Sequence, residues 1–310
     1  MTNPVSPDVV QAICTAHGLG QIVRVVQPVQ GNINLCLLIN DAYVLRFDVL
    51  DWGGANRYAG EKWAYDILSG SEVPVSRVLA LDTSKRLSPY DYLILTKMPG
   101  ETVSTSAAAL PPTARYAIGY SAGQHLATLH NHAFDQFGLL YEIIAGTPQP
   151  DWAAYVAGHF RYYLGQVRAL EILPADRLGR IEALLARMQP LLAAVQQGVL
   201  IHGDYHFSNM LQQDGELSAV LDFDWASSGD PSWDFRIDDS IETEAPGSRE
   251  ALYAGYTSRR PLPAGHWERV SFYRIGLYLD YLEAAAQDKN EIARITALLL
   301  HEMDWLERRV

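Results

Sequence analysis

The spacing of apolar residues changes near residue 100, and this change constrains the fold more than any other feature of the sequence. Before it, short apolar runs alternate with Gly, Pro, Asn and Asp, which is typical of β-strands joined by turns. Asn40 and Asp41 predict a tight turn between two of these runs. Helices are expected over Pro7–His17, which Ser6 would cap, and Tyr58–Leu68. The predicted strands are Ile22–Gln27, Ile33–Ile39, Tyr43–Phe47, Arg77–Leu81 and Tyr92–Thr96.

Beyond Pro99 and Gly100 the apolar residues recur mainly at helical spacing. One β-rich segment, Val199–Asp222, interrupts this pattern. We therefore predict an α+β protein with a small N-terminal sheet lobe over residues 1–97, a linker over 98–101, and a larger, mainly helical lobe over 102–310. The predicted helices of the second lobe are Pro112–Asn131, Trp152–Leu170, Pro174–Gln196, Ala264–Ala286 and Glu291–Arg309.

Composition narrows the classes of function. The 24 basic and 36 acidic side chains give a net charge of −12, which argues against binding to a nucleic-acid backbone. The two cysteines, Cys14 and Cys36, have no metal-ligand spacing and favour a reducing compartment. The N-terminal residues lack a basic and apolar leader, and no apolar run approaches the roughly 18–20 residues that cross a bilayer. We expect a cytoplasmic protein that does not bind membranes.

The strongest chemical signal is the segment IHGDYHFSNMLQQDGELSAVLDFDWASSGDPSWDF, residues 201–235. Asp204 precedes Asn209 by five residues, and Asp222 follows Asn209 by thirteen. The residues between Asn209 and Asp222 predict a hairpin that turns at Asp214-Gly215, so the two oxygen-bearing side chains would meet at its open end. Such oxygen ligands suit Mg²⁺ held together with substrate phosphates. Asp204 would then orient or deprotonate an attacking hydroxyl.

These residues resemble the aminoglycoside phosphotransferase and choline kinase family, whose fold is protein-kinase-like. The kinase catalytic loop reads H-R-D-x-x-x-x-N, and here His202-Gly203-Asp204 is followed by Asn209, with glycine in place of arginine. Gly229-Asp230-Pro231 after Asp222 also fits the family. The resemblance implies ATP or GTP and Mg²⁺ as cofactors, Asp204 as catalytic base, and Asn209 and Asp222 as Mg²⁺ ligands.

The first lobe offers the other half of a nucleotide site. The turn Gly31-Asn32-Ile33-Asn34 lies where the kinase fold places its phosphate-covering loop, and Gly31, Asn32 and Asn34 suit such a turn. Arg46 resembles the cation of the family's third strand that contacts phosphates, and Glu61 is its expected partner on the next helix. Lys97 and Met98 resemble the linker whose backbone receives the nucleotide base.

Acidic and aromatic residues in the second lobe bear on the acceptor. Carboxylates beside aromatic rings favour a cationic acceptor, such as an aminoglycoside or choline, although such residues also occur as core and solvated faces. A neutral or zwitterionic alcohol such as a macrolide, a sugar or homoserine remains open. By family resemblance Asp234 would also brace the catalytic loop. The candidate substrate residues are Asp234, Asp238, Asp239 and Tyr278.

The leading hypothesis is a kinase that transfers the γ-phosphoryl group of ATP or GTP to a hydroxyl of a small molecule. A non-catalytic nucleotide-binding protein of the same fold is an alternative, although Asp204, Asn209 and Asp222 argue against it. A zinc hydrolase would need His202 and His206 on one helical face, which the intervening glycine disfavours. A protein-kinase role is disfavoured because no Ala-Pro-Glu motif follows Asp222.

Overall fold

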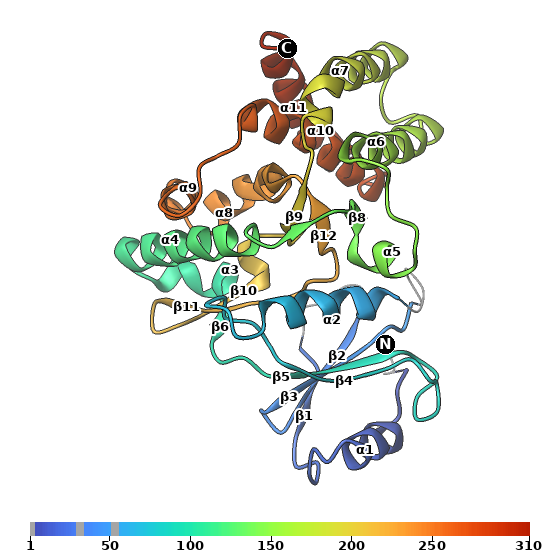
Figure 1. The fold of residues 1–310 in the computed structure, drawn as a ribbon, viewed down its shortest axis with the longest axis vertical. Coiled ribbons are helices and arrows are strands. Elements are labelled where there is room, and N and C mark those ends of the chain that lie inside the picture. The colour runs from blue at the N-terminus through green and yellow to red at the C-terminus, as the bar shows by residue number, and fades with distance from the viewer. Residues whose placement is uncertain (1–3, 29–33, 51–55) are drawn as a thin grey trace.

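The computed structural model describes residues 4–28, 34–50 and 56–310 and shows the predicted α+β architecture, with a small antiparallel sheet lobe below a larger helical lobe (Figure 1). The five strands of the first sheet run in the order β1-β2-β3-β5-β4. Their bounds are Val25–Val26 for β1, Leu35–Ile39 for β2, Tyr43–Phe47 for β3, Val78–Asp82 for β4 and Tyr92–Thr96 for β5.

The two faces of this sheet are covered by different helices because side chains alternate along each strand. On β5, Ile94 packs into the core beneath helix α1 (Pro7–Ala16), whereas Leu93 and Leu95 pack on the side of helix α2 (Arg57–Leu68). Ser6 caps α1 by accepting a hydrogen bond from the Val9 amide, as its sequence predicted. Helix α2 therefore lies between the sheet and the second lobe (Figure 1).

The turn between β2 and β3 is the predicted one. Asn40 and Asp41 both adopt the left-handed conformation, with φ of 54° and 56°. Such a two-residue turn matches the twist of an antiparallel pair, and asparagine and aspartate tolerate it better than most side chains. The turn sets the register of β2 and β3, in which Cys36 lies opposite Arg46. This register fixes the position of Arg46 in the sheet.

The second lobe packs its long helices around two short sheets. Helix α10 crosses α6, and α7 and α11 complete this bundle, whose interior holds Trp152, Phe160 and Tyr273. The four strands of one sheet run in the order β7-β9-β12-β8. The bounds are α4 Pro112–Leu129, α6 Trp152–Ala169, α7 Ala175–Ala193, α10 His266–Ala284, α11 Lys289–Glu307, β7 Ala133–Phe134, β8 Gly138–Leu139, β9 Gly198–Ile201 and β12 Ser227–Gly229.

The predicted hairpin is present as β10 (Met210–Gln213) and β11 (Glu216–Val220), and β10 also pairs with β6 (Glu101–Thr102). Its turn residues Asp214 and Gly215 have φ of 55° and 84°. Strand β6 begins at Glu101, the last residue of the predicted linker, so the chain enters the second lobe beside this hairpin. The hairpin thus lies against the segment that joins the two lobes.

Several short elements were not predicted. They are the two-residue strands β6, β7 and β8, the strand β12, and the helices α3 (Val103–Ser106), η1 (Ala107–Ala109), α5 (Leu140–Ile144) and η2 (Phe207–Asn209). Most are too short to show a period. After Pro231, where helical structure was expected, the structure has η3 (Pro231–Ile237), α8 (Asp238–Glu244) and α9 (Ser248–Thr257). Across the described ranges, the helices are too short or too polar to span a bilayer.

Candidate active site between the two lobes

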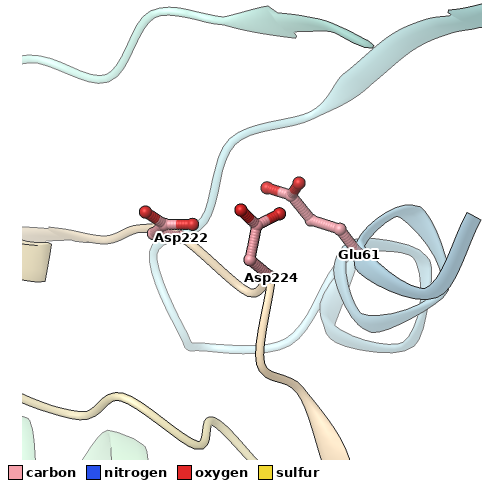
Figure 2. Close-up of side chains that lie close together, drawn as sticks. All are labelled: Glu61, Asp222 and Asp224. Carbon is pink, nitrogen blue, oxygen red and sulfur yellow. The ribbon is translucent and has the colours of Figure 1, made fainter. Parts of the chain in front are cut away.

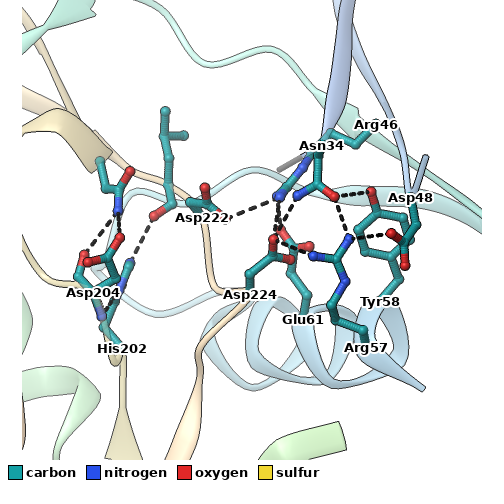
Figure 3. Close-up of polar contacts among 12 residues, drawn as sticks. Asn34, Arg46, Asp48, Arg57, Tyr58, Glu61, His202, Asp204, Asp222 and Asp224 are labelled. Carbon is teal, nitrogen blue, oxygen red and sulfur yellow. Dashed lines mark hydrogen bonds and ion pairs between the residues drawn. The ribbon is translucent and has the colours of Figure 1, made fainter. Parts of the chain in front are cut away.

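The loop after β9 holds the predicted catalytic aspartate. Gly203 has φ of 84°, and a Cβ at this position would collide with the backbone oxygen of Trp225, so only glycine fits here. His202 is fully buried, and its Nε2 lies 2.8 Å from the Leu221 carbonyl oxygen while its Nδ1 lies 3.2 Å from the Asp204 amide. His202 therefore carries its proton on Nε2 and ties this loop to the hairpin that precedes Asp222 (Figure 3).

A buried carboxylate fixes the same loop from behind. Asp234, on η3, is 2% exposed and accepts hydrogen bonds from the backbone amides of His202 (2.8 Å) and Gly203 (2.7 Å). Its Oδ2 also lies 3.1 Å from Nε2 of His130, at the C-terminal end of α4. Burial raises the pKa of Asp234, but these partners outweigh it and hold the pKa below the usual range.

The hairpin brings Asn209 and Asp222 together. Met210 pairs with Val220, and the Leu221 amide donates to the Asn209 carbonyl oxygen at 2.9 Å, so the residues flanking the hairpin face one another. The Asn209 side-chain amide donates to the Asp204 carboxylate at 2.7 Å. Asp222 adopts a left-handed backbone with φ of 63° at this point, a strained conformation that often occurs at functional positions.

Asp204 is held as an anion. Its Oδ2 lies 3.2 Å from Nε2 of His206 and also accepts the Asn209 amide. Burial raises the pKa of Asp204, but the hydrogen bond and positive charge of His206 outweigh it and lower the pKa below its usual value. An ionised carboxylate is the state that accepts a proton from a hydroxyl.

Across the junction, Arg46 of β3 reaches three carboxylates. Its guanidinium forms an ion pair with Glu61 of α2 and lies 3.1 Å from Asp222 and 2.9 Å from Asp224 (Figure 3). Figure 2 shows Glu61 pointing from α2 toward Asp222 and Asp224, which lie on one loop of the second lobe. Arg46 thus balances acidic groups of both lobes.

A second buried arginine supports this arrangement. Arg57, at the start of α2, lies 3.1 Å from Asp48 and 3.3 Å from Asp224, and it also bonds to the Asn34 side chain. Asn34 in turn donates to Asp224 at 2.7 Å. Burial raises the pKa of Asp224, yet Arg46, Arg57 and Asn34 keep it below its usual value. Asn34 is therefore fixed to the second lobe.

Two oxygen atoms at this junction suit a hard divalent cation. Asn209 uses its amide group as a donor, and within the described residues its Oδ1 accepts no hydrogen bond. Asp222 bonds to Arg46 through Oδ1, and its side chain is 44% exposed. Amide and carboxylate oxygens are the ligands that Mg²⁺ prefers, so this pair fits the ion. The carboxylates of Glu61, Asp222 and Asp224 have ligand atoms within 4.8 Å of one another, but all three already pair with Arg46.

The sequence from residue 24 to residue 273 matches the model of the phosphotransferase enzyme family. The match covers most of the chain and includes every residue of the junction described above. The chain belongs to this family. It is a phosphotransferase of the group that contains aminoglycoside and ketoamine kinases.

Individual relatives support the assignment. A curated Escherichia coli (strain K12) protein named probable ketoamine kinase YniA is 28% identical over 228 residues, which span 70% of this chain and 71% of the relative. The structure of the gentamicin–APH(2")-IIa complex superposes with a TM-score of 0.71 at 16% identity, covering 98% of this chain and 99% of that one. A putative fructosamine-3-kinase from Thermobifida fusca gives 0.68 at 18% identity over 95% and 99%. The two structural matches show the kinase-like fold.

The remaining nucleotide-site predictions have mixed outcomes. Gly31 and Asn32 lie outside the described residues. Lys97 lies directly after β5, and its backbone amide donates to the Ala42 carbonyl oxygen at 2.8 Å, so this amide is already used within the protein. Met98 follows and is half-buried. The Lys97 ammonium group lies 3.7 Å from a carboxylate oxygen of Asp41. The base-contacting role of Lys97 and Met98 stays a prediction.

The acidic residues that we predicted to face a substrate are engaged inside the protein. Asp234 braces the catalytic loop, as the family resemblance implied, and its 2% exposure removes it from the substrate candidates. Asp238 is 1% exposed and pairs with Arg274, and that expectation is corrected as well. Asp239 is more exposed but pairs with Arg249 at 2.5 Å. Tyr278 is 6% exposed and packs in the helical core, so its side chain serves packing.

The alternative zinc cluster is not assembled in the part of the chain that the structure describes. His202 is turned toward the Leu221 carbonyl oxygen, and His206 lies outside any helix, so the two rings do not share a face. Neither Arg57 nor Arg236 was assigned a role from the sequence, because isolated arginines carry no motif. Asp224 was not among the predicted site residues, although its position two residues after Asp222 placed it at the junction.

Proposed function

We propose that this phosphotransferase is a nucleoside-triphosphate-dependent kinase that transfers the γ-phosphoryl group of ATP, or of GTP, to a hydroxyl group of a small molecule. The observation that carries the proposal is the ion pair between Asp222, in the lobe that also holds Asp204, and Arg46 of the other lobe, which is itself paired with Glu61. A base and a phosphate-binding cation on opposite sides of one junction are what phosphoryl transfer between two bound substrates requires.

Each group has a defined role in the proposed reaction. The Asp204 carboxylate accepts a hydrogen bond from the acceptor hydroxyl and takes its proton as the oxygen attacks the γ-phosphorus. The bond between the γ-phosphorus and the bridging oxygen breaks, and the nucleoside diphosphate leaves. Arg46 binds the phosphates through its fork of N–H donors, and the ion pair with Glu61 fixes its direction.

Asn209 and Asp222 would hold a divalent ion. Such an ion, when bound, neutralises negative charge on the phosphate oxygens. The chain contributes the placement of these two side chains, since the hairpin fixes their separation and His202 locks the hairpin to the catalytic loop. The Mg²⁺ role of Asn209 and Asp222 remains part of the proposal and rests on their unoccupied oxygen atoms.

The comparisons guide the choice of acceptors. The curated relative is named a probable ketoamine kinase, and solved neighbours include aminoglycoside phosphotransferases in complexes with gentamicin and with GDP. Both names describe acceptors that carry amines and several hydroxyl groups. Ketoamines are therefore the first class to test, followed by aminoglycosides, choline, homoserine, simple sugars and a macrolide.

The test measures phosphorylation directly. Purified protein is incubated with ATP or GTP, Mg²⁺ and each acceptor, and nucleoside diphosphate release is measured together with mass spectrometry of the acceptor. We expect one acceptor class to gain a phosphoryl group with wild-type protein and not with the Asp204→Asn variant. Tight nucleotide binding without transfer to any acceptor would contradict the proposal and favour a non-catalytic binding protein.

A further inference from the structure

Arg236 is a cation at the catalytic loop that the proposed reaction does not yet use. It lies on η3, two residues after Asp234, and its side chain is only partly buried. Its Nη2 donates to the Gly203 carbonyl oxygen at 2.6 Å and its Nη1 to the Trp233 carbonyl oxygen at 3.0 Å. Through the first of these bonds the guanidinium is fixed beside the residue that precedes the catalytic base.

The charge of Arg236 is not paired with an acid. Within residues 4–28, 34–50 and 56–310, no carboxylate oxygen lies within 4.0 Å of its guanidinium. The neighbouring arginines differ, since Arg269 pairs with Asp230 and Arg274 with Asp238. A guanidinium has five N–H donors, and two carbonyl groups leave some of them available. A cation that is fixed, yet unpaired, is suited to an anionic ligand.

An aromatic ring holds the guanidinium in place. The Arg236 guanidinium carbon lies 4.4 Å from the centre of the Trp233 ring, which is a stacking contact. Trp233 is itself fixed from behind by Tyr155 and His159 of α6, with ring centres 5.7 and 5.4 Å away. Because the side chain is already ordered, binding an anion costs little conformational entropy.

Helix α10 packs against η3, the element that carries Arg236. Burial raises the pKa of Asp280 and of Tyr281 on α10, and the positive charge of Arg236 opposes this in both. The same charge contributes to the low pKa of Asp204. Tyr281 is 38% exposed, and Arg236 itself is only partly buried. The positive charge of Arg236 thus acts on the catalytic base and on α10 alike.

We infer that the acceptor carries a carboxylate that Arg236 binds, so that a hydroxyl group of the same molecule lies at Asp204. The inference deepens the proposed function and rests on it. It also agrees with the internal pairing of Asp234 and Asp238, which removes these acids as ligands for a polycation.

Two ketoamines that differ only in whether they carry a carboxylate test the inference. The products of glucose with glycine and of glucose with glycinamide share the sugar and the amine and differ only in the carboxylate. Homoserine and homoserine amide form a second pair. With wild-type protein we expect kcat/KM at least about tenfold higher for the acid of the pair that is phosphorylated, the factor expected for one charged hydrogen-bonding contact.

Variants of Arg236 separate ligand binding from support of the loop. Arg236→Gln should lower kcat/KM about tenfold or more for the acid and leave the amide nearly unchanged, which removes the preference. Arg236→Lys should keep part of the preference, since the charge remains but the fork is lost. The control is Arg168→Gln, which removes an arginine from an exposed ion pair with Glu182 between α6 and α7. Nucleotide affinity and the unfolding midpoint verify that each variant is folded.

The outcomes distinguish the inference from the proposed function. Equal kcat/KM for acid and amide in the wild type, or an equal loss for both in Arg236→Gln, would overturn the carboxylate assignment and leave the kinase intact. That second pattern would show that Arg236 only supports the Gly203 carbonyl group. Transfer to neither member of either pair, but to an acceptor without a carboxylate such as an aminoglycoside, would overturn the inference and leave the kinase intact. Transfer to no acceptor at all, with nucleotide still bound, would count against both.

Discussion

Nη2 of Arg46 lies 3.1 Å from Oδ1 of Asp222, so a side chain of the first sheet reaches the hairpin end of the second lobe directly. Arg46 is 7% exposed and is the shared partner of Glu61 and Asp224 as well. A single buried ion pair adds little net stability, but removing its cation leaves buried carboxylates without a partner and lowers the stability strongly. Its role in stability and its role in nucleotide binding are therefore linked.

Replacing Arg46 should affect both roles. Arg46→Met leaves buried Glu61 without its cation, and we expect unfolding to become easier by roughly 3–5 kcal/mol, together with weaker nucleotide binding. Adding Glu61→Gln should recover part of the stability and none of the affinity. Chemical denaturation and nucleotide titration measure the two effects. As a control, Arg24→Met breaks the exposed pair with Asp41 and should change stability by less than about 1 kcal/mol. If the double variant lost as much free energy of unfolding as the sum of the two single variants, Arg46 and Glu61 would not depend on each other, and the prediction would be wrong.

The Asp204→Asn variant tests the catalytic base. Asparagine keeps the size of the side chain but cannot take a proton, so kcat should fall by about 10²–10⁴-fold, while nucleotide affinity stays within about twofold. Initial rates and nucleotide titration give the two values. Asp214→Asn, in the hairpin turn, is the matched control because asparagine tolerates its left-handed backbone. A kcat close to that of the wild type would exclude Asp204 as the base.

The fold was largely predictable because its elements are long or strictly patterned. The strand Tyr43–Phe47 and the strand Tyr92–Thr96 have the bounds that their alternation and flanking turns predict. The hairpin was predictable from Asp214-Gly215, a dipeptide that needs left-handed backbone. By contrast, α9 packs closely against α4 through glycines such as Gly123 and Gly255, and contacts of this kind become visible only when both helices are placed.

The site was predictable only where residues follow one another in a motif. Asp204, Asn209 and Asp222 are set by short spacings, and Arg46 and Glu61 by their places on adjacent elements. The acidic residues after Asp230 were predicted to face a substrate, but they pair with arginines of α9 and α10. Charge pairing between distant segments depends on packing, which a single sequence does not reveal.

Asp234 should act through the catalytic loop it braces. In Asp234→Asn one carboxylate oxygen becomes an N–H₂ group facing donors, so a hydrogen bond worth roughly 1.5–3 kcal/mol is lost. We expect kcat to fall about tenfold to a hundredfold, with the acceptor KM and nucleotide affinity little changed, since Asp234 contacts neither. Steady-state kinetics separate these parameters. Asp176→Asn, at the exposed start of α7, is the control. A rise in acceptor KM at constant kcat would instead indicate that Asp234 contacts the substrate.

Buried His266 should make the fold sensitive to mild acid. Burial lowers the pKa of His266 to about 3, compared with the ordinary value of about 6.5 expected in the unfolded chain. The unfolded chain therefore binds a proton at a higher pH than the folded one, and the stability that neutral His266 contributes is complete above pH 6.5 and is lost as the pH falls toward 3. Between pH 7 and pH 5 this loss is roughly 2 kcal/mol.

The His266→Gln variant removes this titration, so its free energy of unfolding should decline less steeply between pH 7 and pH 5 than that of the wild type. Urea denaturation at a series of pH values measures both slopes. The variant loses the hydrogen bond to Ser232 and will be less stable at pH 7, but that loss does not depend on pH. His301→Gln, on the exposed face of α11, should keep the wild-type slope. Parallel curves for the wild type and His266→Gln would show that His266 takes up its proton as readily in the folded protein as in the unfolded chain, contrary to its burial.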